Sequence, residues 1–304
     1  MLANWRQSLS AELYGGLLIL SAMAILGLGD NIFYYLEPHM GLGQFHALRS
    51  LICLILLVPF ALITGARLLP DRWGPILMRT AFLSASMFLY FGSLPIMSVA
   101  EAAAGLFTAP IFVLLFTRLV YKERIGVRRI LAVMVGTIGV LFVLRPDEVG
   151  FHILQLMPVA GGALYAMAAM TTRRYCADEP PLSLVAVFFF VIGLTGALAT
   201  TMLDMRPVSE ALFEAAPFFF RGWMALDLVT SGWIIFQGSL TVVAIALLTR
   251  GYQVAETSYM AVFEYSLLIF AAAWTYIMFG QALAVTSIIG FVLIASAGVI
   301  VSRA

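Results

Sequence analysis

Residues 94–119 read LPIMSVAEAAAGLFTAPIFVLLFTRL, and residues 250–277 read RGYQVAETSYMAVFEYSLLIFAAAWTYI. Both stretches carry a Val-Ala-Glu triplet, which ends at Glu101 in the first and at Glu256 in the second. Two such copies, about half a chain apart, indicate an internal repeat. Because both copies lie in sequence apolar enough for lipid, we expect a duplicated, all-helical (all-α) integral membrane protein.

The composition places the chain in a lipid bilayer. Of its 304 residues, 62% are hydrophobic and 11% are charged, against roughly 25% charged residues in a soluble domain. The apolar runs last about 20 residues instead of alternating over about 10, which favours helices over a barrel. The net charge of +1 provides no basic field, so we expect no nucleic acid among the partners.

The apolar runs predict about ten membrane-spanning helices. They cover residues 13–36, 44–64, 76–94, 99–119, 127–144, 151–170, 182–202, 229–248, 256–279 and 283–301. The first run continues too far for a signal peptide and ends in bulky residues, so we expect it to be retained. Residues 204–226 are too charged to span but contain several aromatic residues, which predicts an interfacial helix on the outer face.

Basic residues are concentrated in every second loop, and this bias predicts the orientation of the chain. Loops rich in Lys and Arg stay on the cytoplasmic side of a membrane. The basic loops hold Arg6, Arg67, Arg72, Arg79, Arg118, Lys122, Arg124, Arg128, Arg129, Arg173, Arg174, Arg250 and Arg303. The opposite loops hold Arg145, Arg206 and Arg221. We therefore expect a multi-pass protein of a bacterial inner membrane with both termini in the cytoplasm.

The repeat divides the chain into two halves of five predicted spans each. Beyond the Val-Ala-Glu match, YKERIGVRRILAVMVGTIGVLFVL (121–144) aligns with FGQALAVTSIIGFVLIASAGVIVS (279–302). An odd number of spans in the first copy makes the second copy enter the membrane from the opposite side. We therefore predict two inverted five-helix repeats, residues 1–147 and residues 148–304.

Residues 90–146 combine several features along one stretch. They contain a helix of small residues, Pro110 within that helix, Glu123 and Arg124 at its end, and a final helix with spaced glycines. This pattern resembles the drug/metabolite transporter superfamily, specifically tandem EamA-type halves of five helices each. The stretch GDNIFYYLEPHMGLGQFHALRS (29–50) further resembles the subgroup that includes S-adenosylmethionine, riboflavin and metallophore transporters.

The resemblance implies a secondary carrier that works by alternating access. It implies a midplane cavity lined by spans one, three, four, six, eight and nine. The expected substrate is a small polar or amphipathic metabolite of amino-acid, nucleoside, flavin, sulfonium or amine type, and the expected direction is efflux. The sequence has no phosphate-binding loop, so we expect no nucleotide cofactor and transport driven by gradients. A homodimer is an open alternative to a monomer.

Ionisable residues inside spans predict functional sites, because a charge at the bilayer centre costs from about 3 to 10 kcal/mol or more. Asp30 lies deep in the first predicted span, and Arg49 lies at a matching depth in the second. A pair between Asp30 and Arg49 would neutralise both charges, and arginine suits bidentate recognition of carboxylates or phosphates. The alternative is a purely structural ion pair. Asn31 and His46 would extend the same polar patch.

Glu264 lies close to the middle of the ninth predicted span, with no cation near it in the sequence. A carboxyl group away from water is expected to be neutral or to meet a cationic ligand. We therefore expect Glu264 to serve proton coupling or the recognition of substrate charge. The alternative is a neutral Glu264 that bonds to a facing hydroxyl group or to Gln237.

Glu101 and Glu256 open the fourth and ninth predicted spans from opposite sides of the membrane. Stabilisation of a helix N-terminus by a carboxylate explains both, but their equivalence in two inverted copies also predicts gating elements. Tyr90, Tyr165 and Tyr259 place aromatic rings with polar tips inside spans. Stacking on a ring-bearing substrate is the functional alternative to simple packing.

Enzymatic interpretations find little support. GLGD at residues 27–30 matches a signature of intramembrane aspartyl proteases, which need a second carboxylate to share a proton, but no other Asp falls within a predicted span. The histidines show no zinc-binding spacing, and Cys53 and Cys176 lie in different environments, so we expect neither a metal site nor a disulfide. We expect a protein that is not an enzyme. A non-transporting membrane enzyme or sensor and a channel are the rival interpretations.

Overall fold

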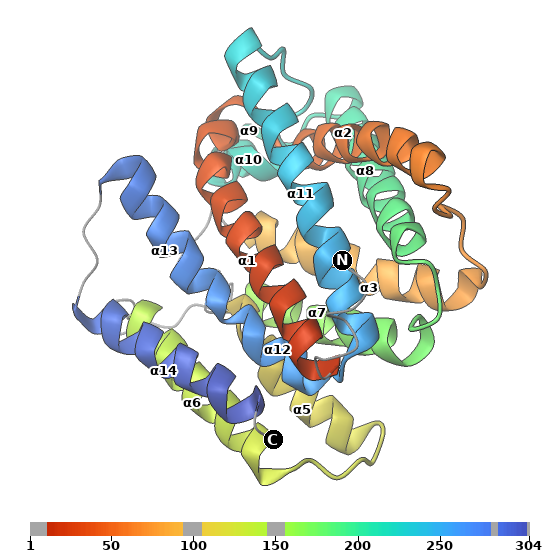
Figure 1. Cartoon of the computed structure of the whole chain (residues 1–304). Helices are drawn as coiled ribbons and strands as arrows, with labels where there is room; N and C mark the ends of the chain where they lie inside the picture. The colour runs from red at the N-terminus through yellow and green to blue at the C-terminus, as the bar shows by residue number, and fades with distance from the viewer. Residues whose placement is uncertain (1–10, 94–104, 145–155, 281–284, 303–304) are drawn as a thin grey trace.

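The computed structural model describes residues 11–93, 105–144, 156–280 and 285–302, which form helices and no strands (Figure 1). The helices are α1 (Ala11–Leu36), α2 (Leu42–Thr64), α3 (Trp73–Ser93), α5 (Ala109–Leu119), α6 (Val127–Leu144), α7 (Leu156–Tyr175), α8 (Pro181–Met205), α9 (Glu210–Ala215), α10 (Pro217–Phe220), α11 (Leu228–Val254), α12 (Thr257–Glu264), α13 (Ser266–Phe279) and α14 (Val285–Ser302). A short 3-10 helix, η2 (Glu37–His39), links α1 to α2. The all-α prediction is confirmed for these residues.

Six stretches of the described residues are long and apolar enough to cross a membrane. They are Ala11–Phe33, Leu42–Thr64, Trp73–Ser93, Pro181–Met205, Leu228–Val254 and Tyr259–Phe279. Ala109–Leu119 and Ile288–Ile300 are shorter apolar helices. Parts of the predicted spans 99–119 and 151–170 lie outside the described residues. The structure thus supports a multi-pass membrane protein, and the count of ten spans stays a prediction.

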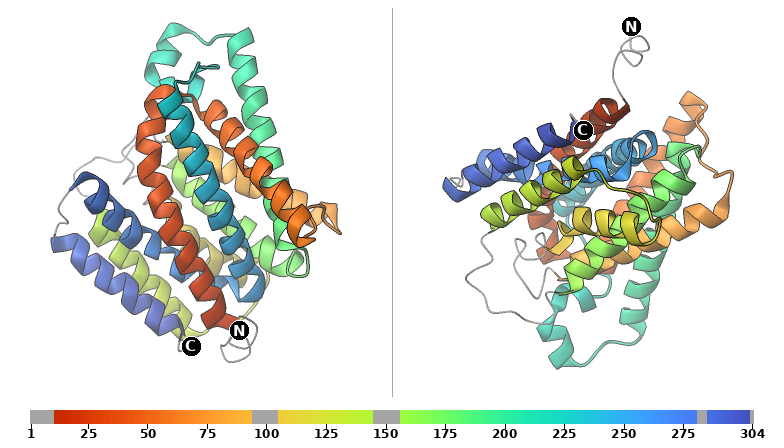
Figure 2. Two further views of the ribbon diagram at one scale, coloured as in Figure 1. Left: turned by 45° about the horizontal axis from the view of Figure 1, so that its top comes forward. Right: turned by 90° about the horizontal axis from the view of Figure 1, so that it is seen from below.

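The helices run back and forth between two ends of the bundle. As drawn in Figure 2 (left), α1 begins at the lower end, and η2, α9 and α10 lie at the upper end. The most extensive contacts join α1 to α11, α3 to α7, α2 to α8 and α6 to α14, and further contacts join α1 to α13 and α5 to α7. Each of these pairs brings together one helix from each half of the sequence. The two halves therefore interleave.

The ninth predicted span, residues 256–279, is interrupted instead of continuous. α12 ends at Glu264 and α13 begins at Ser266. At the interruption the Tyr265 N–H donates to Val262 O at 3.3 Å and the Leu268 N–H donates to Tyr265 O at 3.2 Å. This three-residue spacing is that of a 3-10 turn, which often marks a hinge inside a helix. Hydropathy does not detect it, because apolar residues continue on both sides.

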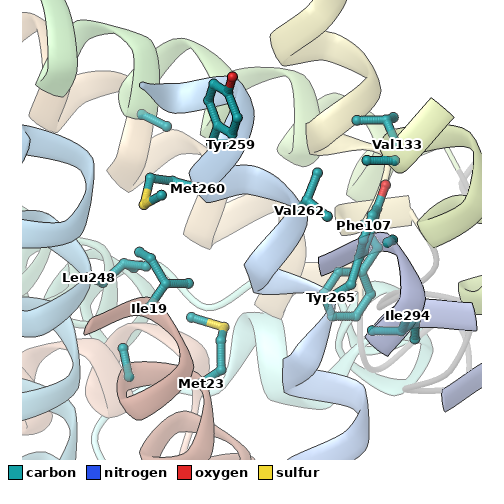
Figure 3. Close-up of a cluster of buried hydrophobic side chains, with 14 of the residues drawn as sticks. Ile19, Met23, Phe107, Val133, Leu248, Tyr259, Met260, Val262, Tyr265 and Ile294 are labelled. Atoms are coloured by element: carbon teal, nitrogen blue, oxygen red, sulfur yellow. The ribbon is translucent and has the colours of Figure 1, made fainter. Parts of the chain in front are cut away.

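A buried hydrophobic cluster surrounds the interruption (Figure 3). Its members include Ile19, Met23, Phe107, Val133, Leu248, Tyr259, Met260, Val262, Tyr265 and Ile294. They come from α1, α6, α11, α12 and α14 and from the turn before α5. The Tyr265 hydroxyl also lies 2.9 Å from that of Thr137 in α6. The interrupted helix is therefore anchored to both halves of the chain.

Residues 204–226 do not form the predicted interfacial helix. They hold two short helices, α9 and α10, and Phe218 of α10 is only 1% exposed, because it packs into an aromatic cluster with rings of α1, α2 and α3. Gln44 of α2 fixes the segment: its Nε2 donates to Met224 O at 2.7 Å, and its Oε1 accepts from the Met224 N–H at 2.9 Å. Aromatic burial against neighbouring helices outweighs a surface position, and the segment covers the upper end.

Both cysteines are free, as their separate environments predict, and both are buried. Cys176 lies in the loop between α7 and α8, where burial raises the pKa of its thiol to about 11. Next to it, the side chain of Glu179 accepts the backbone N–H groups of Asp71 and Arg72 at 2.8 and 3.0 Å. Glu179 therefore ties the α2–α3 loop to the α7–α8 loop at the lower end.

Close helix approach at Gly27 leads to a stability prediction. A methyl group added at Gly27 would lie 2.8 Å from the backbone nitrogen of Ala271 in α13, whereas one at Gly29 would meet Gln237 Nε2 at 3.7 Å, an ordinary contact. We expect Gly27→Ala to lower the free energy of unfolding by about 1–3 kcal/mol through overpacking. The matched control Gly29→Ala should be neutral or slightly stabilising. Thermal unfolding in one detergent checks this, and equal melting temperatures would contradict it.

Candidate binding cavity

A cavity of about 130 Å³ lies inside the bundle. Its walls come from α1, α3, α7, α11, α12 and α13, and from α5 with the turn that precedes it. These elements belong to predicted spans one, three, four, six, eight and nine, as the family resemblance implied. Two further helices contribute, since Arg49 of α2 and Phe188 of α8 also line the wall.

Four polar residues from four helices line the upper part of the cavity, and we call them the upper polar group: Asp30, Arg49, Tyr90 and Gln237. Asp30 is exposed to the cavity and makes no hydrogen bond or ion pair within the described residues. Gln237 is 5% exposed, and its Oε1 has no hydrogen-bond partner among those residues. The upper polar group therefore contains a carboxyl group at the cavity and a buried amide oxygen, both without hydrogen-bond partners among the described residues.

The guanidinium group of Arg49 is held away from Asp30. Its Nη2 lies 3.0 Å from His46 Nδ1, and its Cζ lies 4.6 Å from the ring centroid of Phe45 and 5.5 Å from that of Phe91. The expected ion pair with Asp30 is wrong for this structure, although the two charges still act on each other at longer range. Two aromatic faces and an imidazole nitrogen already stabilise the cation.

Four further polar residues of the cavity wall form what we call the lower polar group: Arg79, Tyr165, Tyr252 and Glu264. Glu264 is 6% exposed, and its Oε1 accepts a hydrogen bond from the Tyr165 hydroxyl at 2.5 Å. Glu264 therefore does meet a facing hydroxyl group. The hydroxyl of Tyr252 is buried beside Glu264 and Tyr165 but makes no hydrogen bond of normal geometry in the described part of the chain.

Arg79 lines the cavity. The prediction that it belongs to a basic cytoplasmic loop is therefore wrong. It lies in the second turn of α3 and is 4% exposed. Its Nε donates to Thr172 Oγ1 at 3.2 Å, its Nη1 to Leu184 O at 3.1 Å and its Nη2 to Thr249 Oγ1 at 3.2 Å. None of the ion pairs within the described ranges involves it. A basic residue near the end of an apolar run is easily assigned to the adjoining loop.

The two polar groups lie far apart along the cavity. Arg79 and Tyr90 are both on α3 and eleven residues apart, which corresponds to about 16 Å along a helix. The wall between them is largely apolar and includes Leu83, Met87, Phe107, Ala168, Ala169 and Leu248. The cavity is therefore elongated and mainly apolar, with one polar group at each end.

Two of the predicted substrate-binding residues, Asn31 and Tyr259, are not part of the cavity wall. Asn31 bridges α1 and α13, because its Nδ2 donates to Ala271 O at 3.1 Å and its Oδ1 accepts from Thr275 at 2.7 Å. Tyr259 packs in the buried cluster of Figure 3, with the guanidinium of Arg129 4.3 Å from its ring centroid. Glu101 lies outside the described residues.

Two ion pairs at the lower end connect the halves of the chain, and we call them the lower ion pairs. Arg129 of α6 pairs with Glu256, the residue before α12. Arg174 of α7 pairs with Glu123 at 2.7 Å and lies 4.3 Å from the ring centroid of Tyr121. Glu256 thus has a cationic partner contributed by the opposite half.

Comparison with known proteins gives one family and several relatives. Residues 13–145 match the EamA-like transporter family. A riboflavin transporter of Brucella anthropi is 26% identical over 217 residues, which is 71% of this chain and 72% of that protein. An S-adenosylmethionine uptake transporter of Rickettsia bellii is 23% identical over 253 residues, 83% and 80% of the two chains. A pseudopaline exporter of Pseudomonas aeruginosa is 23% identical over 229 residues, 75% and 74% of the two chains.

The fold itself is also found among solved structures. One crystal structure superposes with a TM-score of 0.78 at 18% identity and covers 97% of this chain and 96% of that one. The described helices therefore form a known fold over nearly the whole chain. The family match over residues 13–145 and the relatives, all named as transporters, confirm the resemblance to the drug/metabolite transporter superfamily that the sequence indicates.

Proposed function

We propose that the protein is a secondary active transporter that carries a small polar or amphipathic metabolite through the bundle by alternating access. The observation that carries the proposal is the elongated cavity with a polar group at each end. Arg49 Nε, Gln237 Oε1 and the Tyr252 hydroxyl are buried in its wall without hydrogen-bond partners among the described residues. Buried polar atoms are normally paired, and a bound solute would supply the missing partners.

The relatives support a small organic solute as the substrate, since their names specify riboflavin, S-adenosylmethionine and pseudopaline. Typical sites for such ligands measure about 300–1,000 Å³, and the cavity measures about 130 Å³. We therefore propose that the described conformation is contracted and that the helices separate to admit the substrate. Efflux is the proposed direction, although the relatives include both uptake and export proteins.

The two halves are proposed to be inverted five-helix repeats that divide near residue 147. In this scheme α1 corresponds to α7, α3 to α11 and α5 to α13. The contact of α1 with α11 then has its counterpart in that of α7 with α3, and the contact of α1 with α13 in that of α7 with α5. The helix interruptions also correspond: α5 begins at Ala109 after one, and α12 ends at Glu264 before the other. Ala109 and Glu264 are separated by the same number of residues in the sequence as Glu101 and Glu256. Inverted repeats supply two equivalent gates around one site. In this scheme Glu256 and Glu101 belong to opposite gates.

The predicted orientation and coupling complete the proposal. With both termini in the cytoplasm of a bacterial cell, the lower end of the bundle faces the cytoplasm and the upper end faces outward. Glu264 is the proposed proton carrier, because it is a buried carboxyl group in the cavity wall beside the interrupted helix. Protonation and release at Glu264 would then alternate with substrate binding in the same space.

Counterflow in proteoliposomes tests this function. Vesicles are loaded with unlabelled riboflavin, S-adenosylmethionine, an amino acid, a nucleoside or an amine, and the labelled compound is added outside. A carrier should accumulate label transiently against its gradient, and Ala169→Trp, which fills the cavity, should abolish this. Equilibration without overshoot would indicate a channel. Chemical conversion on one face without exchange would replace the transporter by an enzyme.

A further inference from the structure

The buried positive charge of Arg79 in the lower polar group is not explained by the transport function alone. We propose that the lower polar group is an oxyanion subsite, in which the Arg79 guanidinium and the Tyr252 hydroxyl bind a carboxylate or phosphate group of the solute. The proposal rests on the transport function for the identity of that solute as cargo. Its cargo class would be elongated, amphipathic organic anions.

The first argument is charge. A buried arginine keeps its positive charge, and burial without a counter-charge is unfavourable. Arg79 is 4% exposed, and its hydrogen-bond partners are two threonine hydroxyls and one backbone carbonyl, all neutral. These bonds use three of the five N–H groups that a guanidinium offers. The remaining donors and the uncompensated charge are suited to an oxyanion, which arginine binds in bidentate fashion.

The second argument is the hydroxyl of Tyr252. This side chain is 3% exposed and lines the same cavity, and its hydroxyl, although it lies beside Glu264 and Tyr165, makes no hydrogen bond of normal geometry among the described residues. Tyr252 lies three residues after Thr249, the residue of α11 that accepts from Arg79. Residues three apart share a helix face, so the unused hydroxyl lies on the side of α11 that faces Arg79. An anion there would accept from both residues.

The surroundings favour an anion here and a different group at the other end. Glu264 accepts a hydrogen bond from Tyr165 and lies beside Tyr252, but Arg79 meets no carboxylate at ion-pair distance among the described residues. At the upper end, Asp30 and Gln237 Oε1 offer acceptors instead. Arg49 is less suitable for an anion, because two aromatic rings and His46 cover it. A solute would therefore place its oxyanion at Arg79 and its donor groups near Asp30.

Matched probes that differ by one charge test the subsite. Affinities of the purified full-length protein are measured for riboflavin against riboflavin 5′-phosphate, and for 4-phenylbutanol against 4-phenylbutyrate. We expect each anionic member to bind at least about tenfold more tightly than its neutral partner. Arg79→Gln should reduce that ratio to below about twofold without weakening the neutral probe, and Arg79→Lys should keep part of it. The control Arg67→Gln, at an exposed ion pair, should leave the ratio unchanged.

Tyr252→Phe provides a second variant that does not depend on the folding of Arg79→Gln. Because the hydroxyl makes no hydrogen bond of normal geometry within the described residues, this variant should nearly keep the melting temperature of the wild type yet bind the anionic probe several-fold more weakly. A preference in only one probe pair would assign the subsite to phosphate or to carboxylate. Equal binding of charged and neutral probes by the wild type, a ratio that survives Arg79→Gln, or full anion affinity in Tyr252→Phe would overturn the proposal.

The outcome for the subsite can be separated from the outcome for transport. If the anion preference depends on Arg79 but no compound shows counterflow, the subsite stands and the transport function fails. If neutral solutes show counterflow that Arg79→Gln leaves unchanged, and the anionic probes bind no better than the neutral ones, transport stands and the subsite fails.

Discussion

Uptake driven by a pH gradient should fall at least about tenfold when Glu264 is replaced by Gln, while exchange without a gradient should continue. Glu264 is 6% exposed in the cavity wall, and its carboxyl group accepts a hydrogen bond from Tyr165 at 2.5 Å. Glutamine has nearly the same size and retains an acceptor oxygen, but it cannot gain or lose a proton. The substitution therefore removes proton carriage and preserves packing.

The measurement compares two assays on the same proteoliposomes: uptake after an imposed pH step, and counterflow at equal pH on both sides. Glu210→Gln, at an exposed glutamate of α9, is the matched control and should change neither. Tyr165→Phe should reduce pH-driven uptake less than Glu264→Gln, since the carboxyl group remains. Unchanged pH-driven uptake in Glu264→Gln would reject the coupling role, and loss of both activities would reassign Glu264 to substrate binding.

Reversing the charge of Glu256 should open the lower end of the bundle. Glu256 and Arg129 connect α12 and α6, and therefore connect the two halves of the chain. Their side chains are 37% and 20% exposed, and pairs of this exposure contribute only about 0–1 kcal/mol to stability. Glu256→Arg would instead place two like charges in contact, which favours separation of the helices. We expect a shift between conformations with little change in the melting temperature.

This shift can be measured as a change in the accessibility of the cavity to a labelling reagent. A single cysteine at Ala169, in a chain with Cys53 and Cys176 replaced by alanine, is labelled by a membrane-impermeant maleimide from the lower side. Glu256→Arg should raise the labelling rate several-fold, and the double variant with Arg129→Glu should restore it to within about twofold, because it re-forms an ion pair. Asp71→Arg serves as the control.

The control is informative because the Asp71 side chain pairs with Arg67 inside one exposed loop, and the contact of Asp71 with Glu179 of the other half uses the backbone N–H, which the substitution retains. A labelling rate that Glu256→Arg does not change would mean that the lower ion pairs take no part in gating. A rate that the double variant does not restore would attribute the effect to altered packing around α12.

Much of this architecture follows from the order of apolar and polar residues along the sequence. A run of about 20 apolar residues predicts a helix, because in lipid a helix satisfies the hydrogen bonds of all its backbone N–H and C=O groups. Most described helix bounds agree with these runs to within a few residues. A polar residue inside such a run is conspicuous, which is why Asp30, Tyr165 and Glu264 could be selected and are found in the cavity wall. Arg79 escaped notice, since a basic residue near the end of a run is read as part of the loop.

The remaining features depend on which face each helix turns toward its neighbours. Position along a helix sets the depth of a residue in the membrane, and depth alone suggested that Asp30 meets Arg49 and that Tyr259 faces a solute. Packing instead places the Arg49 guanidinium near Phe91 of α3 and Tyr259 in a hydrophobic cluster, while Tyr252 reaches the cavity. Rotation about a helix axis is decided by contacts between residues distant in sequence. Apolar spacing therefore fixes the helices and their depth, and interhelical packing decides which polar groups share the cavity.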